Sequence, residues 1–144
     1  MMEKPVTLAL IGAGGIGALW ASGIKKSAAV RLAAVADTDE ARAKGISALH
    51  NGCAVFADWK EIARLPEVDG VIVAVPHKWL APITQGFFEA GKHVLCEKPA
   101  GISSAEVTAN IELAAKKKLI YMTGFNHRYH PAFAEAKKRF SARE

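Results

Sequence analysis

Cysteine is scarce and long apolar runs are missing from this sequence. Its 144 residues include two cysteines, Cys53 and Cys96, and the apolar, strand-like setting of Cys96 argues against a disulfide framework. No run of about 18 apolar residues occurs, so no membrane-spanning helix is expected. The opening residues 1–5 lack the small-residue cleavage pattern of a secretory signal. We therefore expect a protein of the reducing cytoplasm with no membrane partner.

The positive charge is not concentrated in one segment, although the net charge is +5. Basic clusters at 25–26, 116–118 and 137–139 lie near the ends of expected helices, where the helix dipole favours cations. Solvated helix ends are the favoured interpretation, and a nucleic-acid surface is the alternative. We expect no nucleic-acid partner and no metal site.

Apolar runs of strand length alternate with segments of helical spacing along the whole chain. A hydrophobic content of 51% over 144 residues is enough for one buried core, so residues 1–144 are interpreted as one domain. The expected strands are 6–11, 30–36, 54–56, 70–75, 93–96 and 119–123. The expected helices are 15–26, 39–49, 58–65, 79–90, 103–117 and 131–140.

This alternation predicts a parallel sheet, because parallel strands need crossover connections and helices provide them. The fold class is therefore α/β, with a doubly wound Rossmann sheet of strand order 3-2-1-4-5-6 in a three-layer α/β/α arrangement. Ligands are expected at the carboxyl edge of the sheet, where the strand order reverses.

A glycine-rich turn follows the first expected strand directly. Gly12, Gly14 and Gly17 form a G-x-G-x-x-G pattern, with Gly15 and Ile16 between the last two. The first glycine allows a tight turn, the second lets a pyrophosphate approach the backbone, and the third lets the helix pack closely on the sheet. The five residues are therefore predicted to bind the phosphates of a dinucleotide at the helix N-terminus.

An acidic residue ends the second expected strand. Asp37 lies 20 residues after Gly17, where a carboxylate can accept hydrogen bonds from the adenosine ribose diol and would repel a 2′-phosphate. Thr38 and Asp39 follow it, so neither of the next two residues is basic. NAD is therefore expected as the cofactor in preference to NADP. The alternative is that Asp37 is an N-cap or turn residue.

Three later segments carry a family resemblance. Residues 73–80 read Val-Ala-Val-Pro-His-Lys-Trp-Leu, residues 91–99 read Gly-Lys-His-Val-Leu-Cys-Glu-Lys-Pro, and residues 124–131 read Gly-Phe-Asn-His-Arg-Tyr-His-Pro. With the glycine turn, they resemble the glucose-fructose oxidoreductase, inositol dehydrogenase and rhizopine-catabolism (Gfo/Idh/MocA) family over nearly the whole chain. The resemblance implies an NAD-dependent oxidoreductase that transfers hydride between NAD and a hydroxyl carbon of a sugar, polyol or related small molecule.

The resemblance also implies roles for individual residues. Lys98 is the expected catalytic residue, which binds substrate and assists proton transfer, and Val75, Pro76, Glu97 and Lys98 are expected to contact the cofactor. A cis bond is implied before Pro99. From the residues alone, a lysine at the carboxyl end of a strand faces the ligand crevice, and the alternative is a surface lysine paired with Glu97.

The sequence departs from the family pattern after the fourth strand. His77 stands where members commonly have Asn, and Leu80 stands where they have His, so any contribution of that histidine is absent or supplied by another group. His77 is interpreted either as a site residue or as a turn residue with a local hydrogen bond. Trp79 is expected either in the pocket wall or, by the usual burial of aromatic residues, in the core.

Family members continue into a second domain that supplies an Asp and a His to the substrate site, whereas this sequence ends at Glu144. No residue here matches that pair, and Asn126 and Arg128 are at most pocket-edge groups. The chain alone is therefore expected to bind NAD without turnover, as a binding or regulatory module would. Apolar surface left open on the sixth strand and last helix is expected to favour a homo-oligomer.

Overall fold

Short segments rich in Val, Ile, Leu and Ala form the strands of a single sheet in the computed structural model, which describes residues 4–141. The strands are β1 (Val6–Ile11), β2 (Val30–Ala36), β3 (Ala54–Phe56), β4 (Gly70–Val73), β5 (His93–Cys96) and β6 (Tyr121–Thr123). Every pairing is parallel, in the order β3-β2-β1-β4-β5-β6. The predicted Rossmann order is confirmed.

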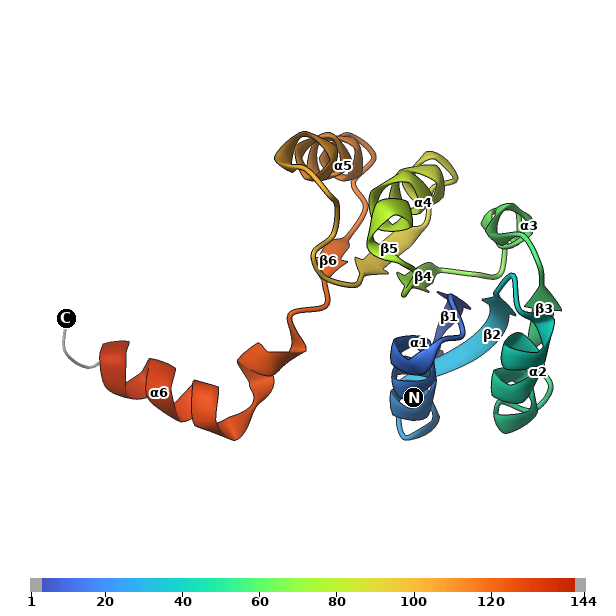
Figure 1. Ribbon diagram of the computed structural model, residues 1–144, viewed down its shortest axis with the longest axis horizontal. Coiled ribbons are helices and arrows are strands. Elements are labelled where there is room, and N and C mark those ends of the chain that lie inside the picture. Colours follow the sequence, from blue (N-terminus) through green and yellow to red (C-terminus); the bar gives the residue numbers. More distant parts are fainter. Residues whose placement is uncertain (1–3, 142–144) are drawn as a thin grey trace.

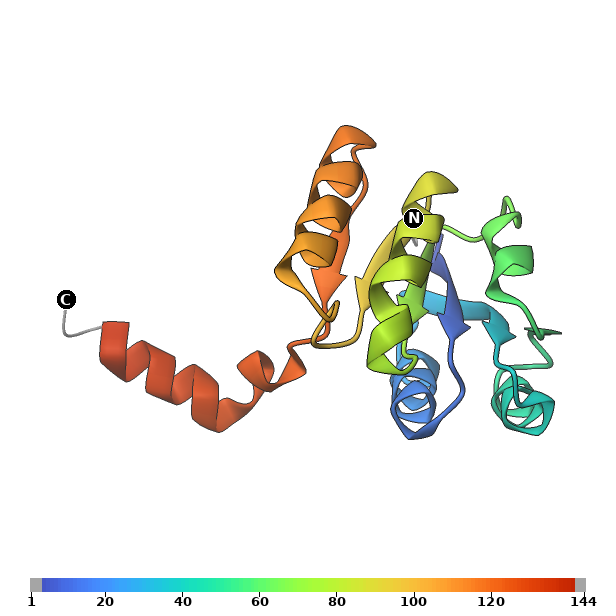
Figure 2. The ribbon, with the colours of Figure 1, turned by 45° about the horizontal axis from the view of Figure 1, so that its top comes forward.

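Helices cover both faces of the sheet (Figures 1 and 2). One face carries α1 and α2, and the other carries α3, α4 and α5. The helices are α1 (Gly15–Lys25), α2 (Glu40–Leu49), α3 (Trp59–Ala63), α4 (His77–Glu89), α5 (Ser104–Lys116) and α6 (Pro131–Ser141), with a short 3-10 helix η1 (Asn126–Tyr129). The three-layer arrangement arises because the first two crossovers lie on one side of the sheet and the later ones lie on the other.

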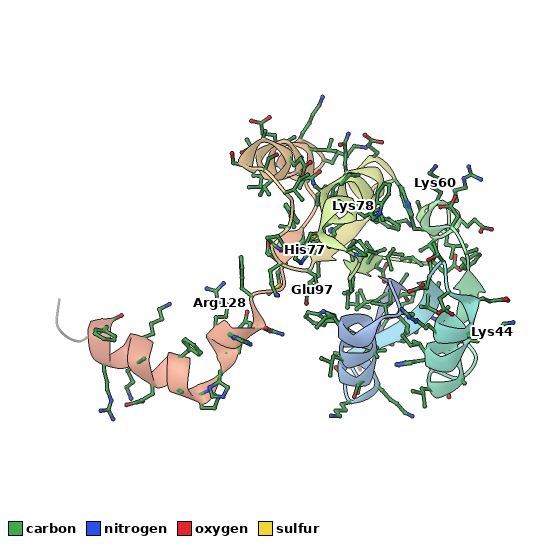
Figure 3. The ribbon with its side chains drawn as sticks, in the orientation of Figure 1. Lys44, Lys60, His77, Lys78, Glu97 and Arg128 are labelled. Atoms are coloured by element: carbon green, nitrogen blue, oxygen red, sulfur yellow. The ribbon has the colours of Figure 1, made fainter. Side chains whose placement is uncertain are left out.

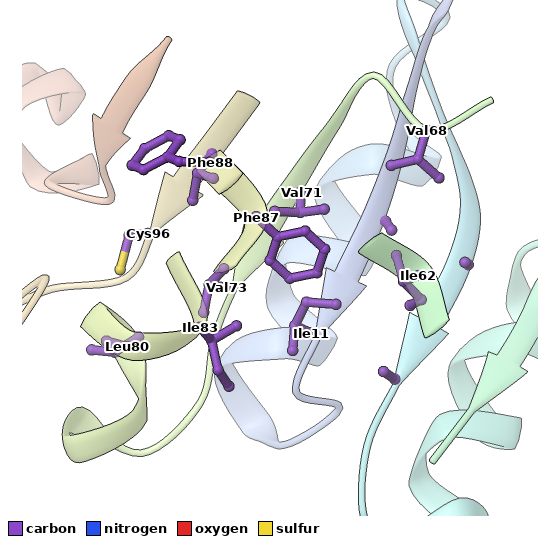
Figure 4. Packing of buried hydrophobic residues seen from close by; sticks show 14 of the residues in the cluster. Ile11, Ile62, Val68, Val71, Val73, Leu80, Ile83, Phe87, Phe88 and Cys96 are labelled. Atoms are coloured by element: carbon purple, nitrogen blue, oxygen red, sulfur yellow. The ribbon is translucent and has the colours of Figure 1, made fainter. Parts of the chain in front are cut away.

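The central strands are buried on both sides because adjacent side chains point to opposite faces. On β1, Ala9 and Ile11 join the cluster under α3 to α5, whereas Leu10 joins the cluster under α1 and α2. Phe87 of α4 lies fully buried in the first cluster (Figure 4). The ring of Trp59 packs on it at a centroid distance of 5.2 Å. This packing fixes α3 and α4 beside the carboxyl edge of the sheet.

Three helices begin directly after a residue whose side chain caps their first turn. Asp39 accepts hydrogen bonds from the N–H groups of Ala41 and Arg42 and so caps α2. Asp58 caps α3 by accepting from the N–H of Lys60, and Ser103 caps α5 by accepting from the N–H of Glu106. These bonds satisfy N–H groups that have no partner within the helix.

The element boundaries differ most from the sequence prediction around β4 and near the C-terminal end of the described residues. β4 ends at Val73 and α4 begins at His77, two residues before the predicted start. Pro76 is the N-cap residue of α4, a position where its missing N–H costs no hydrogen bond within the helix. β6 begins at Tyr121 instead of residue 119, and η1 was not predicted at all. A four-residue 3-10 helix has too few turns to give a periodic signal.

The last helix extends away from the sheet (Figure 1). None of its described residues is buried, and Phe133 and Phe140 are 59% and 73% exposed. Met122 and Phe125 nearby are also exposed, so the predicted open apolar surface on the sixth strand and last helix is present. Within residues 4–141, no helix has the length and apolar character to cross a membrane, and no group of His, Cys, Asp and Glu side chains is arranged to hold a metal ion.

Candidate cofactor-binding cleft

A cleft of about 650 Å³ opens at the carboxyl edge of the sheet, where β1 lies between β2 and β4. The strand order reverses there, because one crossover leads to β2 and a later one returns to β4. Nine of the ten residues expected at the cofactor line this cleft. They are Gly12, Gly14, Gly15, Ile16, Asp37, Val75, Pro76, Glu97 and Lys98. Gly17 is the exception, because it is buried beneath the turn.

The glycine turn is held by backbone packing on one side and is open on the other. Gly12 has a φ of +96°, and a Cβ there would overlap the carbonyl oxygen of Ala74. A Cβ on Gly17 would overlap the carbonyl oxygen of Gly12. By contrast, a Cβ on Gly14 or Gly15 would meet nothing within 4 Å. The turn therefore presents open backbone toward the cleft.

The first helical hydrogen bond of α1 runs from the N–H of Ala18 to the carbonyl of Gly14. The N–H groups of Gly15, Ile16 and Gly17 precede it, and a helix leaves such groups to other acceptors. Phosphate oxygens are suitable acceptors because the helix dipole adds positive charge at this end. The open side of the glycine turn and these N–H donors therefore fit a pyrophosphate.

Asp37 lies between the glycine turn and the start of α2. One carboxylate oxygen accepts the N–H of Ala13 at 2.5 Å, and the other accepts the N–H of Asp39 at 2.8 Å. The residue is thus a turn residue, as the alternative interpretation held, and it also lines the cleft. Each oxygen keeps a further lone pair, so these bonds orient the carboxylate and still allow it to accept from hydroxyl groups.

Glu97 ties the end of β5 to α1. Its buried carboxylate accepts the indole N–H of Trp20 at 2.8 Å and the backbone N–H of Lys98 at 3.1 Å. No ion pair joins Glu97 to Lys98 in the part of the chain that the structure describes, so the surface-pair interpretation is wrong. The Lys98–Pro99 bond is cis, as the resemblance implied. The side chain of Lys98 is exposed on the wall of the cleft.

Comparison with known proteins agrees with this geometry. Residues 6–125 match the Gfo/Idh/MocA family, described as an oxidoreductase family with an NAD-binding Rossmann fold. The chain belongs to this family. It is 34% identical to an inositol 2-dehydrogenase of Rhizobium meliloti over 133 residues, which are 92% of this chain and 40% of that protein. The chain therefore spans well under half the length of this relative.

Two solved structures superpose closely on the chain. The myo-inositol 2-dehydrogenase of Lactobacillus plantarum has a TM-score of 0.90 at 25% identity, over 96% of this chain and 42% of that one. GenD2 from gentamicin A biosynthesis, solved in complex with NAD, has a TM-score of 0.90 at 27% identity, over 96% of this chain and 39% of that one. The chain is therefore an NAD-binding Rossmann domain of an oxidoreductase family.

The residues whose role the sequence left open fall into two groups. His77 and Trp79 both line the cleft together with Glu97, and Figure 3 marks His77 and Glu97. Trp79 is 51% exposed, so the interpretation of Trp79 as a core residue is wrong. Leu80 is fully buried in the core cluster, and it therefore presents no polar group to the cleft. Asn126 and Arg128 lie in η1 and are not among the residues that line it.

Among the cleft residues that the sequence did not predict, three come from helices. Arg42 comes from the first turn of α2, Trp59 from the start of α3 and Ile83 from α4. Trp59 and Ile83 have the spacing of ordinary core residues, so periodicity gives no reason to single them out. The i,i+3 spacing of Asp39 and Arg42 is a signal for a local ion pair, but it does not place that pair in a cleft.

Proposed function

We propose that this chain is the cofactor domain of an NAD-dependent oxidoreductase that acts on a hydroxyl carbon of a sugar or polyol. One observation carries the proposal: the open glycine turn, the oriented carboxylate of Asp37 and the amine of Lys98 line one continuous cleft. The inositol dehydrogenases among the relatives support the substrate class. In this proposal, residues 1–144 are one domain. Residues 1–3 and 142–144 lie outside the described structure.

Each group has a distinct task. The N–H groups at the start of α1 bind the pyrophosphate, with Gly14, Gly15 and Ile16 as its floor. Asp37 accepts the ribose hydroxyls at one end of the cleft. Val75 and Pro76, at the end of β4, contact the cofactor near the switch point. Bound NAD supplies the hydride acceptor, while the protein positions the partners of the reaction.

Lys98 is proposed to handle the reacting oxygen. Glu97 holds the backbone N–H of Lys98 at 3.1 Å, and the carboxylate is itself fixed by the indole of Trp20. The base of the lysine side chain is therefore anchored while its ammonium group remains accessible in the cleft. From there, Nζ can donate a hydrogen bond to a substrate oxygen and take part in moving its proton.

A module that binds NAD without turnover is the second candidate for the chain on its own. Leu80 is buried and apolar, and Lys98 and His77 are the titratable cleft residues beside Glu97 at that end. An exposed site also weakens electrostatic stabilisation of a transition state.

The apolar surface of α6 is proposed to favour a homodimer. The protein is proposed to be cytoplasmic.

The experiment is a titration of the purified chain with NAD, followed by incubation with NAD and a panel of inositols, sugars and sugar acids. We expect saturable NAD binding by calorimetry and no sustained formation of reduced nicotinamide. Failure to bind NAD would refute the cofactor assignment. Sustained turnover that is lost in Lys98→Ala would show that the chain completes its own catalytic site, contrary to the second candidate.

Asp37→Ala tests the cofactor preference. The unaltered chain is expected to bind NAD more tightly than NADP, because a 2′-phosphate would meet this carboxylate. The variant loses the charge and the acceptor for the diol, so the NAD affinity should fall by about tenfold, equivalent to one charge-assisted hydrogen bond. The NADP affinity should stay the same or rise. Unchanged affinities for both dinucleotides would mean that Asp37 only shapes the turn.

A further inference from the structure

A basic side chain lies at the same end of the cleft as Asp37. Arg42 lines the cleft together with Asp37 and Thr38, and it comes from the first turn of α2. Among the cleft-lining residues described, the other basic groups are His77 and Lys98, which follow β4 and β5. These strands lie across β1 from β2. Arg42 is therefore the basic group nearest in the fold to the predicted ribose site.

Asp39 holds this arginine by its side chain. One carboxylate oxygen of Asp39 contacts Nε of Arg42 at 3.0 Å. The other accepts the N–H groups of Ala41 and Arg42 at 3.1 and 3.2 Å. A guanidinium has five N–H donors, so the contact through Nε leaves the two terminal nitrogens with donors to spare. Arg42 is 62% exposed by its side chain and is able to turn.

We propose that Arg42 is a latent binding group for a 2′-phosphate, and that Asp39 keeps it inactive by holding its guanidinium and adding a second negative charge beside Asp37. This inference rests on the proposed NAD binding and deepens it. Preference for NAD is then a balance of two carboxylates against one arginine, and Asp37 does not decide it alone. An arginine released from Asp39 would meet a phosphate with charge-assisted, potentially bidentate hydrogen bonds.

Asp39→Asn is the variant that isolates this effect. Asparagine is as good an N-cap as aspartate, so α2 should still form, while the amide removes the negative charge that holds Arg42. We expect the dissociation constant for NADP to fall by about tenfold, the effect of one charge-assisted bond. The dissociation constant for NAD should change by less than about twofold, because the diol still meets Asp37. Calorimetric titration with both dinucleotides measures the ratio of the two dissociation constants.

The matched control is Glu40→Gln on the same helical turn. Glu40 is paired with Lys44 at 2.7 Å, neither residue lines the cleft, and Lys44 extends outward from α2 (Figure 3). The change in net charge is the same as in Asp39→Asn. We expect the ratio of the NADP and NAD dissociation constants to stay within about twofold of that of the unaltered chain, because a screened surface charge acts weakly at this range.

Two further measurements decide the role of Arg42. The double variant Asp39→Asn, Arg42→Gln should lose the gain in NADP affinity. Adenosine 2′,5′-bisphosphate lacks the nicotinamide half, and its affinity should likewise rise in Asp39→Asn and fall back in the double variant. A gain that survives in the double variant, or an equal gain in Glu40→Gln, would overturn the inference while NAD binding by the unaltered chain still supports the proposed function. If the unaltered chain does not bind NAD, the proposed function is refuted, and this inference is refuted with it because it rests on NAD binding.

Discussion

Gly14→Val should abolish detectable NAD binding and leave the domain folded. Gly14 has φ and ψ of −71° and −171°, a conformation that valine adopts readily. Its Cβ would meet no atom within 4 Å beyond its chain neighbours, so the fold has room for a side chain at this position. The added methyl groups would instead occupy the open side of the turn, where a pyrophosphate must approach the N–H groups of α1. Loss of two charge-assisted hydrogen bonds from these N–H groups to the pyrophosphate would weaken NAD binding by about 100-fold or more.

Gly23→Val is the matched control for this variant. Gly23 lies in α1, which Gly14 precedes as the N-cap. It also has open space at its Cβ position, but it does not line the cleft. We expect its NAD affinity to equal that of the unaltered chain in calorimetric titrations, and both variants to give the circular dichroism of a folded α/β domain. NAD binding by Gly14→Val that matches the control would show that the phosphates lie elsewhere.

Gly17→Ala should destabilise the fold, in contrast to changes at Gly14. A Cβ on this buried glycine would overlap the backbone carbonyl of Gly12, and a carbonyl cannot move aside as a flexible side chain can. The start of α1 would have to shift away from β1, and overpacking of this kind costs about 1–3 kcal/mol or more. We expect the free energy of unfolding to fall by at least about 2 kcal/mol in urea titrations.

Gly23→Ala serves as the reference for that measurement. It replaces an exposed glycine in the same helix, where alanine has the better helix propensity, and it should stabilise the domain by about 0.5–1 kcal/mol. The two changes are chemically identical and should have opposite signs. A Gly17→Ala variant as stable as the unaltered chain would show that the turn and helix can separate without loss of packing.

The alternation of apolar strands and amphipathic helices determined the fold. Segments such as Val6–Ile11 and Val30–Ala36 are apolar on both faces, and a strand of that kind needs helices on both sides. The glycine turn after the first strand indicated a Rossmann sheet, and the strand order is the one typical of that fold. Element ends were less certain where a single proline decided them, as at Pro76 before α4.

The sequence by itself determined the strand order and most of the cleft, because Gly12, Gly14 and Asp37 directly follow strands that end at one edge of a parallel sheet. Tertiary structure alone decided which residues from other elements meet there. The bond from Trp20 to Glu97 joins positions 77 residues apart. The place of Arg42 in the cleft wall depends on how α2 packs against β2 and β3. Sequence periodicity reports which face of an element is buried, but contacts between distant elements exist only once the sheet has brought their ends together.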